Sequence, residues 1–105
     1  MNETVRFSYE GRTLGASLLA EIDHHTARPM REQIDKMLFK HKPDVLVLDF
    51  SEVKFMDSSG IGLIIGRAEI SKNINAHVNI TGLSPRLLRL VRLSGIEKLT
   101  NLSII

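Results

Sequence analysis

The chain has 105 residues, of which 43% are hydrophobic and 25% are charged, and these values fit one soluble domain spanning residues 1–105. A net charge of +2, one tyrosine and no tryptophan give little material for binding nucleic acid. The sequence contains no cysteine, which excludes disulfides and thiol catalysis. No apolar stretch approaches the roughly 20 residues of a membrane span, and the first residues form no apolar signal core, so we expect a cytoplasmic protein.

The beginning of the chain predicts a β-hairpin. Apolar and polar residues alternate over residues 5–10 and again over residues 14–20, and Gly11 lies in the turn between them. Alternation with a period of two is typical of half-buried strands, and a short turn joins strands that run antiparallel.

The segment after the hairpin predicts an amphipathic helix. Residues 30–38 place their apolar side chains on one helical face. A proline is tolerated only in the first turn of a helix, where its missing N–H is not used. Pro29 therefore favours a helix that starts near His25 or Thr26 over one that starts at Asp23.

The second half of the chain predicts alternating strands and helices. Residues 45–50 form an almost unbroken apolar run of strand length, which predicts a strand covered on both faces of its sheet. Further elements are expected as helices over residues 63–69 and 86–93, the latter capped by Ser84, and as strands over residues 76–80 and 99–105. The order β-β-α-β-α-β-α-β predicts an α/β fold with a mixed sheet of about five strands and three or more helices.

Residues 56–62, Met-Asp-Ser-Ser-Gly-Ile-Gly, join the predicted buried strand to the second helix. Such a junction leaves free backbone N–H groups and the positive end of a helix dipole beside the hydroxyls of Ser58 and Ser59. A phosphoryl group on a serine is electrostatically tolerated at this place. Asp57 and either serine are also common helix caps, so the motif alone leaves a phosphorylation site and a cap as open interpretations.

The second helix is apolar around much of its circumference. A core stripe is expected at Ile61, Ile64, Ile65 and Ala68. Leu63 and Ile70 lie on a different side of this helix, with Arg67 between them. Such a helix is either deeply buried or presents a surface to a partner, and the pattern does not decide between the two.

Three chemical alternatives can be weighed from the residues. Ser58 is a conceivable nucleophile of a small serine hydrolase, but the Gly-x-Ser-x-Gly elbow is missing. The glycine spacing matches neither a dinucleotide fingerprint nor a P-loop, although a nucleotide-binding module stays an alternative. His24 and His25 are neighbours, so we expect their rings to point to different sides and not to share a metal ion. We predict no catalytic residue, no metal and no cofactor.

Three segments together resemble the STAS-domain anti-sigma factor antagonists, and most closely their sporulation branch. They are residues 21–27 (Glu-Ile-Asp-His-His-Thr-Ala), residues 55–62 (Phe-Met-Asp-Ser-Ser-Gly-Ile-Gly), and Leu-Ser-Pro at 83–85 with Leu-Ser-Gly at 93–95. They come in the family's order and span nearly the whole chain, which implies a single STAS-type domain. Two features depart from the family: Ala20 replaces a usual glycine, and relatives often continue beyond Ile105 into another helix. A monomer or a weak dimer is expected.

The resemblance implies a partner-switching role. In this family the unphosphorylated antagonist binds an anti-sigma factor that is also a serine kinase, and thereby frees the sigma factor. The kinase uses ATP to phosphorylate the antagonist, which dissociates, and a PP2C-like metal-dependent phosphatase resets it. The phosphorylated serine is the one directly after the aspartate of the motif, here Ser58, and Ser59 is its neighbour.

The resemblance also implies which residues bind the partner. They are Asp23, His24, Thr26, Asp57, Ser58, Ser59, Gly60, Ile61, Gly62, Leu63 and Arg67. Neither nucleic acid nor a membrane is expected as a partner. The alternative within the family is a STAS scaffold module in another partner-switching circuit, such as a stress response.

Overall fold

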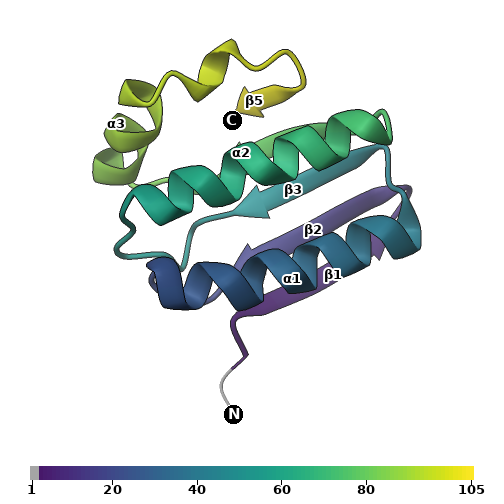
Figure 1. Ribbon diagram of the computed structural model, residues 1–105, viewed down its shortest axis with the longest axis horizontal. Helices are drawn as coiled ribbons and strands as arrows, with labels where there is room; N and C mark the ends of the chain where they lie inside the picture. Colours follow the sequence, from purple (N-terminus) through teal and green to yellow (C-terminus); the bar gives the residue numbers. More distant parts are fainter. Residues whose placement is uncertain (1–2) are drawn as a thin grey trace.

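One five-stranded sheet in the order β1-β2-β3-β4-β5 organises the protein. Figure 1 shows the computed structural model, which describes residues 3–105. The elements in chain order are β1 (Val5–Glu10), β2 (Thr13–Leu18), α1 (His24–His41), β3 (Val45–Asp49), α2 (Ser58–Asn73), β4 (His77–Thr81), α3 (Pro85–Leu93), the 3-10 helix η1 (Ile96–Lys98) and β5 (Leu102–Ile104). β1 pairs with β2 antiparallel, and the other neighbours are parallel. These findings confirm the predicted α/β fold and the order of its elements. Met1 and Asn2, which belong to the expected domain, lie outside the described residues.

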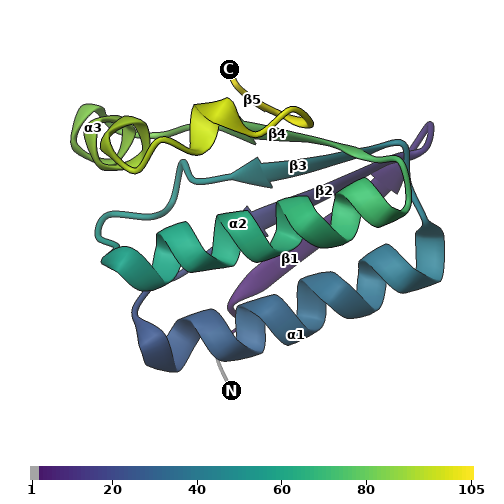
Figure 2. The same ribbon diagram turned by 45° about the horizontal axis from the view of Figure 1, so that its top comes forward.

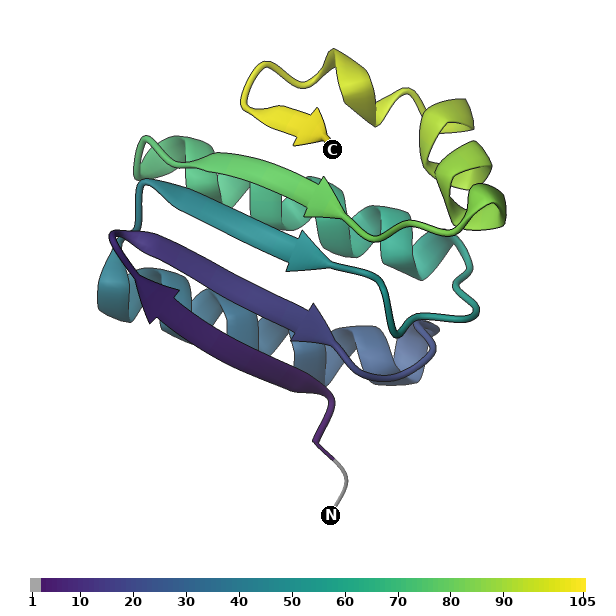
Figure 3. The same cartoon turned by 180° about the vertical axis from the view of Figure 1, so that it is seen from behind.

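Two helices cover one face of the sheet. α1 and α2 lie side by side across it (Figures 1 and 2), whereas Figure 3 shows the opposite face with no helix upon it. The connections from β2 to β3 and from β3 to β4 step in the same direction along the sheet. Because crossovers between parallel strands are right-handed, both helices must then lie on the same face. Within residues 3–105, no helix combines the length and the apolar character that crossing a membrane requires.

The one-sided cover corrects the expectation for residues 45–50. Leu46 and Leu48 point toward the helices and are fully buried, but Val45 and Val47 alternate with them and are only half-buried. The aliphatic side chains on the uncovered face made the run look continuous. The strand is therefore covered on one face and not on two.

The start of α1 also differs from the prediction. The helix begins at His24 with Asp23 as its N-cap, so Pro29 lies inside the helix, beyond the first turn. Proline removes one backbone donor there. The capping box that Asp23 forms with Thr26 fixes the start of the helix at His24, despite the preference of proline for the first turn.

The end of the chain follows the prediction in part. Ser84 caps α3 by accepting the Leu87 N–H at 3.3 Å, and Gly95 adopts a left-handed conformation (φ 79°) after the helix. The strand expected over residues 99–105 is shorter, because η1 precedes it and β5 covers only Leu102–Ile104. α3 lies beyond the carboxyl ends of β3 and β4 (Figures 1 and 3).

Candidate phosphorylation site

The loops that lead into α1 and α2 are joined by backbone hydrogen bonds. The Ile22 N–H donates to the Phe55 carbonyl at 3.0 Å, and the Asp57 N–H donates to the Ile22 carbonyl at 3.1 Å. Ile22 and Met56 thereby form an isolated parallel bridge. The next residue in each loop is an aspartate that caps a helix, Asp23 for α1 and Asp57 for α2. Two segments 34 positions apart in sequence therefore present two helix N-termini side by side.

Asp23 closes the N-terminus of α1 with a capping box. Its carboxylate accepts the N–H groups of His25 at 2.8 Å and Thr26 at 3.0 Å, and the Asp23 N–H donates back to the Thr26 hydroxyl at 3.0 Å. The Thr26 hydroxyl donates in turn to the Glu21 carbonyl at 2.7 Å. The bonds from the Thr26 and His25 N–H groups hold the pKa of Asp23 below its ordinary value.

The two histidines of this segment lie together, which corrects the expectation that they point apart. The ring centroids of His24 and His25 are 4.0 Å from each other at the start of α1. Helix side chains of the first turn can approach each other because no preceding turn confines them. Within residues 3–105, no three side chains of the His, Asp and Glu type gather as metal ligands.

The N-terminus of α2 is more open. Asp57 accepts the Ser59 N–H at 2.8 Å, so the aspartate is the cap and the serines are the first two helical residues. Ser58 is exposed and Ser59 is half-buried. In the described part of the chain, neither serine hydroxyl takes part in a hydrogen bond, and Ser58 has no histidine partner that would act as a base.

Gly60 fits this loop tightly against Met56. A Cβ atom added to Gly60 would lie 2.6 Å from Sδ and 3.1 Å from Cγ of the buried Met56. A Cβ on Gly62, by contrast, would meet no atom within 4 Å. A side chain at Gly60 would therefore force Met56 to shift, whereas a Cβ atom at Gly62 would displace nothing.

The predicted partner-binding residues fall into three classes of exposure. His24, Ser58 and Gly62 are exposed, Asp23, Thr26, Asp57, Ser59 and Ile61 are half-buried, and Gly60, Leu63 and Arg67 are buried. The exposed and half-buried members gather around the paired N-termini. Leu63 and Arg67 instead face inward and lie beneath this surface. For these two residues the apolar pattern of α2 therefore reflects burial and not an exposed partner surface.

Arg67 is held by an ion pair with Asp35 of α1. The distances are 2.7 Å from Nε to Oδ1 and 3.2 Å from Nη2 to Oδ2, and the Arg67 side chain is 4% exposed. Burial raises the pKa of Asp35 and lowers the pKa of Arg67, and in both cases it outweighs their mutual attraction. The pair fixes α2 against α1. Sequence reasoning missed Asp35, because its partner is 32 residues away.

Sequence reasoning also missed a basic groove beside the serines. It has a volume of about 320 Å³ and is lined by His24, Ala27, Arg28 and Arg31 of α1 and by Ser59, Gly62 and Leu63 of α2. His24, Arg28 and Arg31 recur at the helical spacing that shares one face, which is the signal that the sequence offered.

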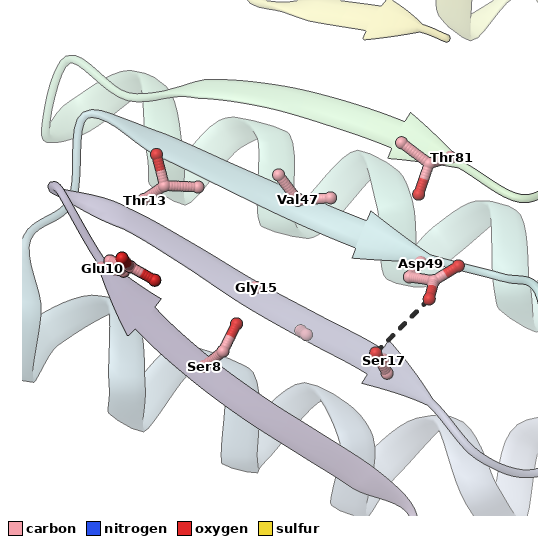
Figure 4. A pocket seen from close by; sticks show the side chains of 9 residues that line it. Ser8, Glu10, Thr13, Gly15, Ser17, Val47, Asp49 and Thr81 are labelled. Atoms are coloured by element: carbon pink, nitrogen blue, oxygen red, sulfur yellow. Dashed lines mark hydrogen bonds between the residues drawn. The ribbon is translucent and has the colours of Figure 1, made fainter.

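A larger hollow lies elsewhere, on the uncovered face of the sheet. It has a volume of about 510 Å³, and Figure 4 shows small and polar side chains around it. The Ser17 hydroxyl lies 3.4 Å from Oδ2 of Asp49 at one end, while Gly15 leaves the middle open. The sheet separates this hollow from α1 and α2, so it is not part of the site at Ser58.

Comparisons with known proteins agree with this arrangement. Residues 12–103 match the STAS domain family. An anti-sigma F factor antagonist of Paenibacillus polymyxa is 30% identical over 99 residues, covering 94% of this chain and 85% of that protein. An anti-sigma-B factor antagonist of Listeria monocytogenes is 34% identical over 77 residues, covering 73% of this chain and 67% of that protein.

A solved structure shares the fold. The anti-sigma factor antagonist SpoIIAA in its unphosphorylated form matches with a TM-score of 0.80 at 24% identity, covering 96% of this chain and 87% of that chain. The chain therefore belongs to the STAS-domain family of anti-sigma factor antagonists. The resemblance seen in the sequence is confirmed.

Proposed function

We propose that the unphosphorylated protein binds an anti-sigma factor that is also a serine kinase, and that phosphorylation of Ser58 ends this binding. One observation carries the proposal. Ser58 is exposed at the first position of α2, directly beside a second helix N-terminus. Asp57 is the N-cap of α2, so the Ser58 hydroxyl is not used as a capping group. The hydroxyl is thus available to a kinase without any rearrangement of the domain.

The physical effect of a phosphoryl group supports a switch at the surface. It brings a charge of about −1.5 to −2 to a loop that already contains Asp57. The helix dipole stabilises a negative charge at an exposed N-terminus by only ~0.3–1 kcal/mol. Like charges brought together in an interface cost several kcal/mol, which lowers affinity by orders of magnitude. The switch therefore needs no change of fold.

The proposed docking surface consists of the exposed and half-buried residues around the two N-termini. The buried Gly60 and Arg67 support this surface from beneath. Leu63 is also buried, but it forms part of the floor of the groove beside the serines. The kinase uses ATP as the phosphoryl donor, and a PP2C-like metal-dependent phosphatase restores the free hydroxyl. Such a circuit places the protein in the cytoplasm, where sigma factors act.

Two substitutions at Ser58 test the proposal. We expect Ser58→Ala to bind the kinase as the wild type does and to resist phosphorylation, and Ser58→Asp to bind at least about tenfold more weakly. Ser59→Ala is the matched control and should be phosphorylated normally. Calorimetry against the anti-sigma kinase of the same genome measures the affinities. Equal affinity of the wild type and Ser58→Asp would contradict the switch.

A second circuit is favoured by part of the comparisons. The relative in Listeria monocytogenes is an anti-sigma-B factor antagonist, so this chain is also a candidate for a stress-response circuit. A pull-down from native extract separates the two circuits through the identity of the captured kinase and sigma factor.

We infer that the protein is a regulator and not an enzyme, because the relatives reported above are named as regulators. The alternative is a small serine hydrolase with Ser58 as nucleophile. Labelling of Ser58 by a broad serine-directed phosphonate would favour the hydrolase and contradict our inference.

A further inference from the structure

The groove between α1 and α2 has walls of unlike chemistry. His24, Arg28 and Arg31 form the α1 side, and Ser59 and Gly62 form part of the α2 side. No lining residue is acidic. Ala27 and Leu63, both buried, add an apolar floor. The groove thus combines positive charge with a small apolar base.

Both guanidinium groups are available to a ligand. Arg28 pairs with Glu32 at 3.2 Å, but the two side chains are 75% and 65% exposed, and exposed pairs of this kind contribute ~0–1 kcal/mol. Arg31 is exposed and forms no salt bridge within residues 3–105, although the Asp35 carboxylate in the next turn of α1 attracts it at longer range. Little energy therefore opposes turning these groups toward a bound anion.

The groove is continuous with the site proposed above. Ser59 lines it, and Ser58 precedes Ser59 on the same helix turn. His24 also belongs to both the groove and the expected docking residues. A partner that covers Ser58 must therefore extend over the mouth of the groove.

We propose that this groove binds an acidic segment of the partner protein, with Arg28 and Arg31 donating to its carboxylates. The inference rests on the proposed function and names the chemistry of the partner. Guanidinium groups suit carboxylates because their paired N–H donors match the two carboxylate oxygens. The apolar floor accepts one small apolar side chain of the segment.

The inference also explains the direction of the switch. The unmodified surface attracts an acidic segment, because its charged lining residues are basic. A phosphoryl group on Ser58 adds negative charge beside the groove and competes for the same guanidinium groups. Phosphorylation therefore weakens the attraction as well as adding repulsion.

Charge reversal in the groove tests the inference in the full chain. We expect Arg28→Glu with Arg31→Glu to weaken kinase binding by more than about tenfold, and this loss to shrink at high salt, where the attraction is screened. The control is Arg86→Glu with Arg89→Glu, which makes the same charge change at exposed positions of α3. Arg28→Gln with Arg31→Gln, monitored by circular dichroism, provides a milder variant if the reversal unfolds the protein.

The outcomes separate the groove from the switch. If the wild type binds no kinase, the proposed function fails. If the wild type binds and the groove variants bind equally well, only the groove inference fails. Titration with a hexaglutamate peptide should shift the amide resonances of His24, Arg28, Arg31 and Ser59. Shifts caused by inorganic phosphate but not by the peptide would show a small-anion site and overturn the inference.

Discussion

The N-termini of α1 and α2 share the same type of N-cap but differ in how completely the cap is closed. Each follows an aspartate cap, and backbone hydrogen bonds hold the two caps in neighbouring loops. Asp23 has Thr26 three residues later, which donates its N–H and accepts the Asp23 N–H in return. Asp57 has Gly60 at that position, which has no side chain to reciprocate. One end is closed for stability, and the other leaves its first hydroxyl free.

The difference between the two caps shows how a small domain can expose a modifiable residue with little loss of stability. The closed end and the backbone bridge fix the position of the open end, so Ser58 need not contribute to stability. A hydroxyl that makes no structural bond can accept a phosphoryl group without loss of a fold contact.

Removing the ion pair between the helices should have the largest effect on this arrangement. Asp35→Ala leaves Arg67 buried without its partner, and such a change costs roughly 3–5 kcal/mol of the free energy of unfolding. Urea denaturation followed by circular dichroism measures the loss. The double variant Asp35→Leu with Arg67→Met removes both charges and should recover most of it. A single variant as stable as the wild type would show that the pair does not join the helices.

Two glycines of the open end should respond in opposite directions. Gly60→Ala forces a Cβ against Met56 and should destabilise the protein by about 1–3 kcal/mol, less the gain in helix propensity. Gly62→Ala meets no neighbouring atom and should stabilise α2 by ~0.5–1 kcal/mol. Thermal unfolding of the two variants under identical conditions makes the comparison. Equal effects would mean that Gly60 is not held against Met56.

The smallest expected effect is the difference in melting temperature between variants that lack one or the other cap. Asp23→Ala removes two accepted N–H bonds and Asp57→Ala removes one, so the melting temperature should fall by a few degrees for the first and by less for the second. The reverse order would contradict the comparison of a closed and an open end.

The contribution of Asp23 should also depend on pH. Its pKa in the folded protein lies below its ordinary value of 3.8, so the folded state favours the ionised form. The stabilisation is therefore present above the unfolded pKa and is lost as the pH falls through the folded pKa. The difference between the wild type and Asp23→Ala should shrink on acidification below pH 3.8. If the stability difference between the wild type and Asp23→Ala stays constant to low pH, the hydrogen bonds accepted by the ionised Asp23 carboxylate do not stabilise the fold.

Local patterns predicted the parts of the fold that local physics controls. Alternation located β1, β2 and β4, a continuous apolar run located β3, and Ser84 located the start of α3. Contacts between distant segments were out of reach. The one-sided cover of β3 depends on where two crossovers place their helices, and Arg67 is buried because Asp35 of another helix neutralises it.

The candidate site divides in the same way. The residues of the serine loop were found from their motif, and the resemblance assigned Ser58 as the acceptor. The choice of Asp57 as the cap required the bond to the Ser59 N–H. Arg28 and Arg31 were missed because only the approach of α2 turns one face of α1 into a groove.

Mapping of the phosphorylation site tests the central claim most directly. The chain is incubated with Mg-ATP and the anti-sigma kinase of the same genome, and the modified residue is identified by mass spectrometry while binding is followed in the same sample. We predict a single phosphoryl group on Ser58 together with loss of binding. A phosphoryl group on Ser59, or none from an active kinase, would contradict the account and reduce the open end of α2 to an ordinary helix start.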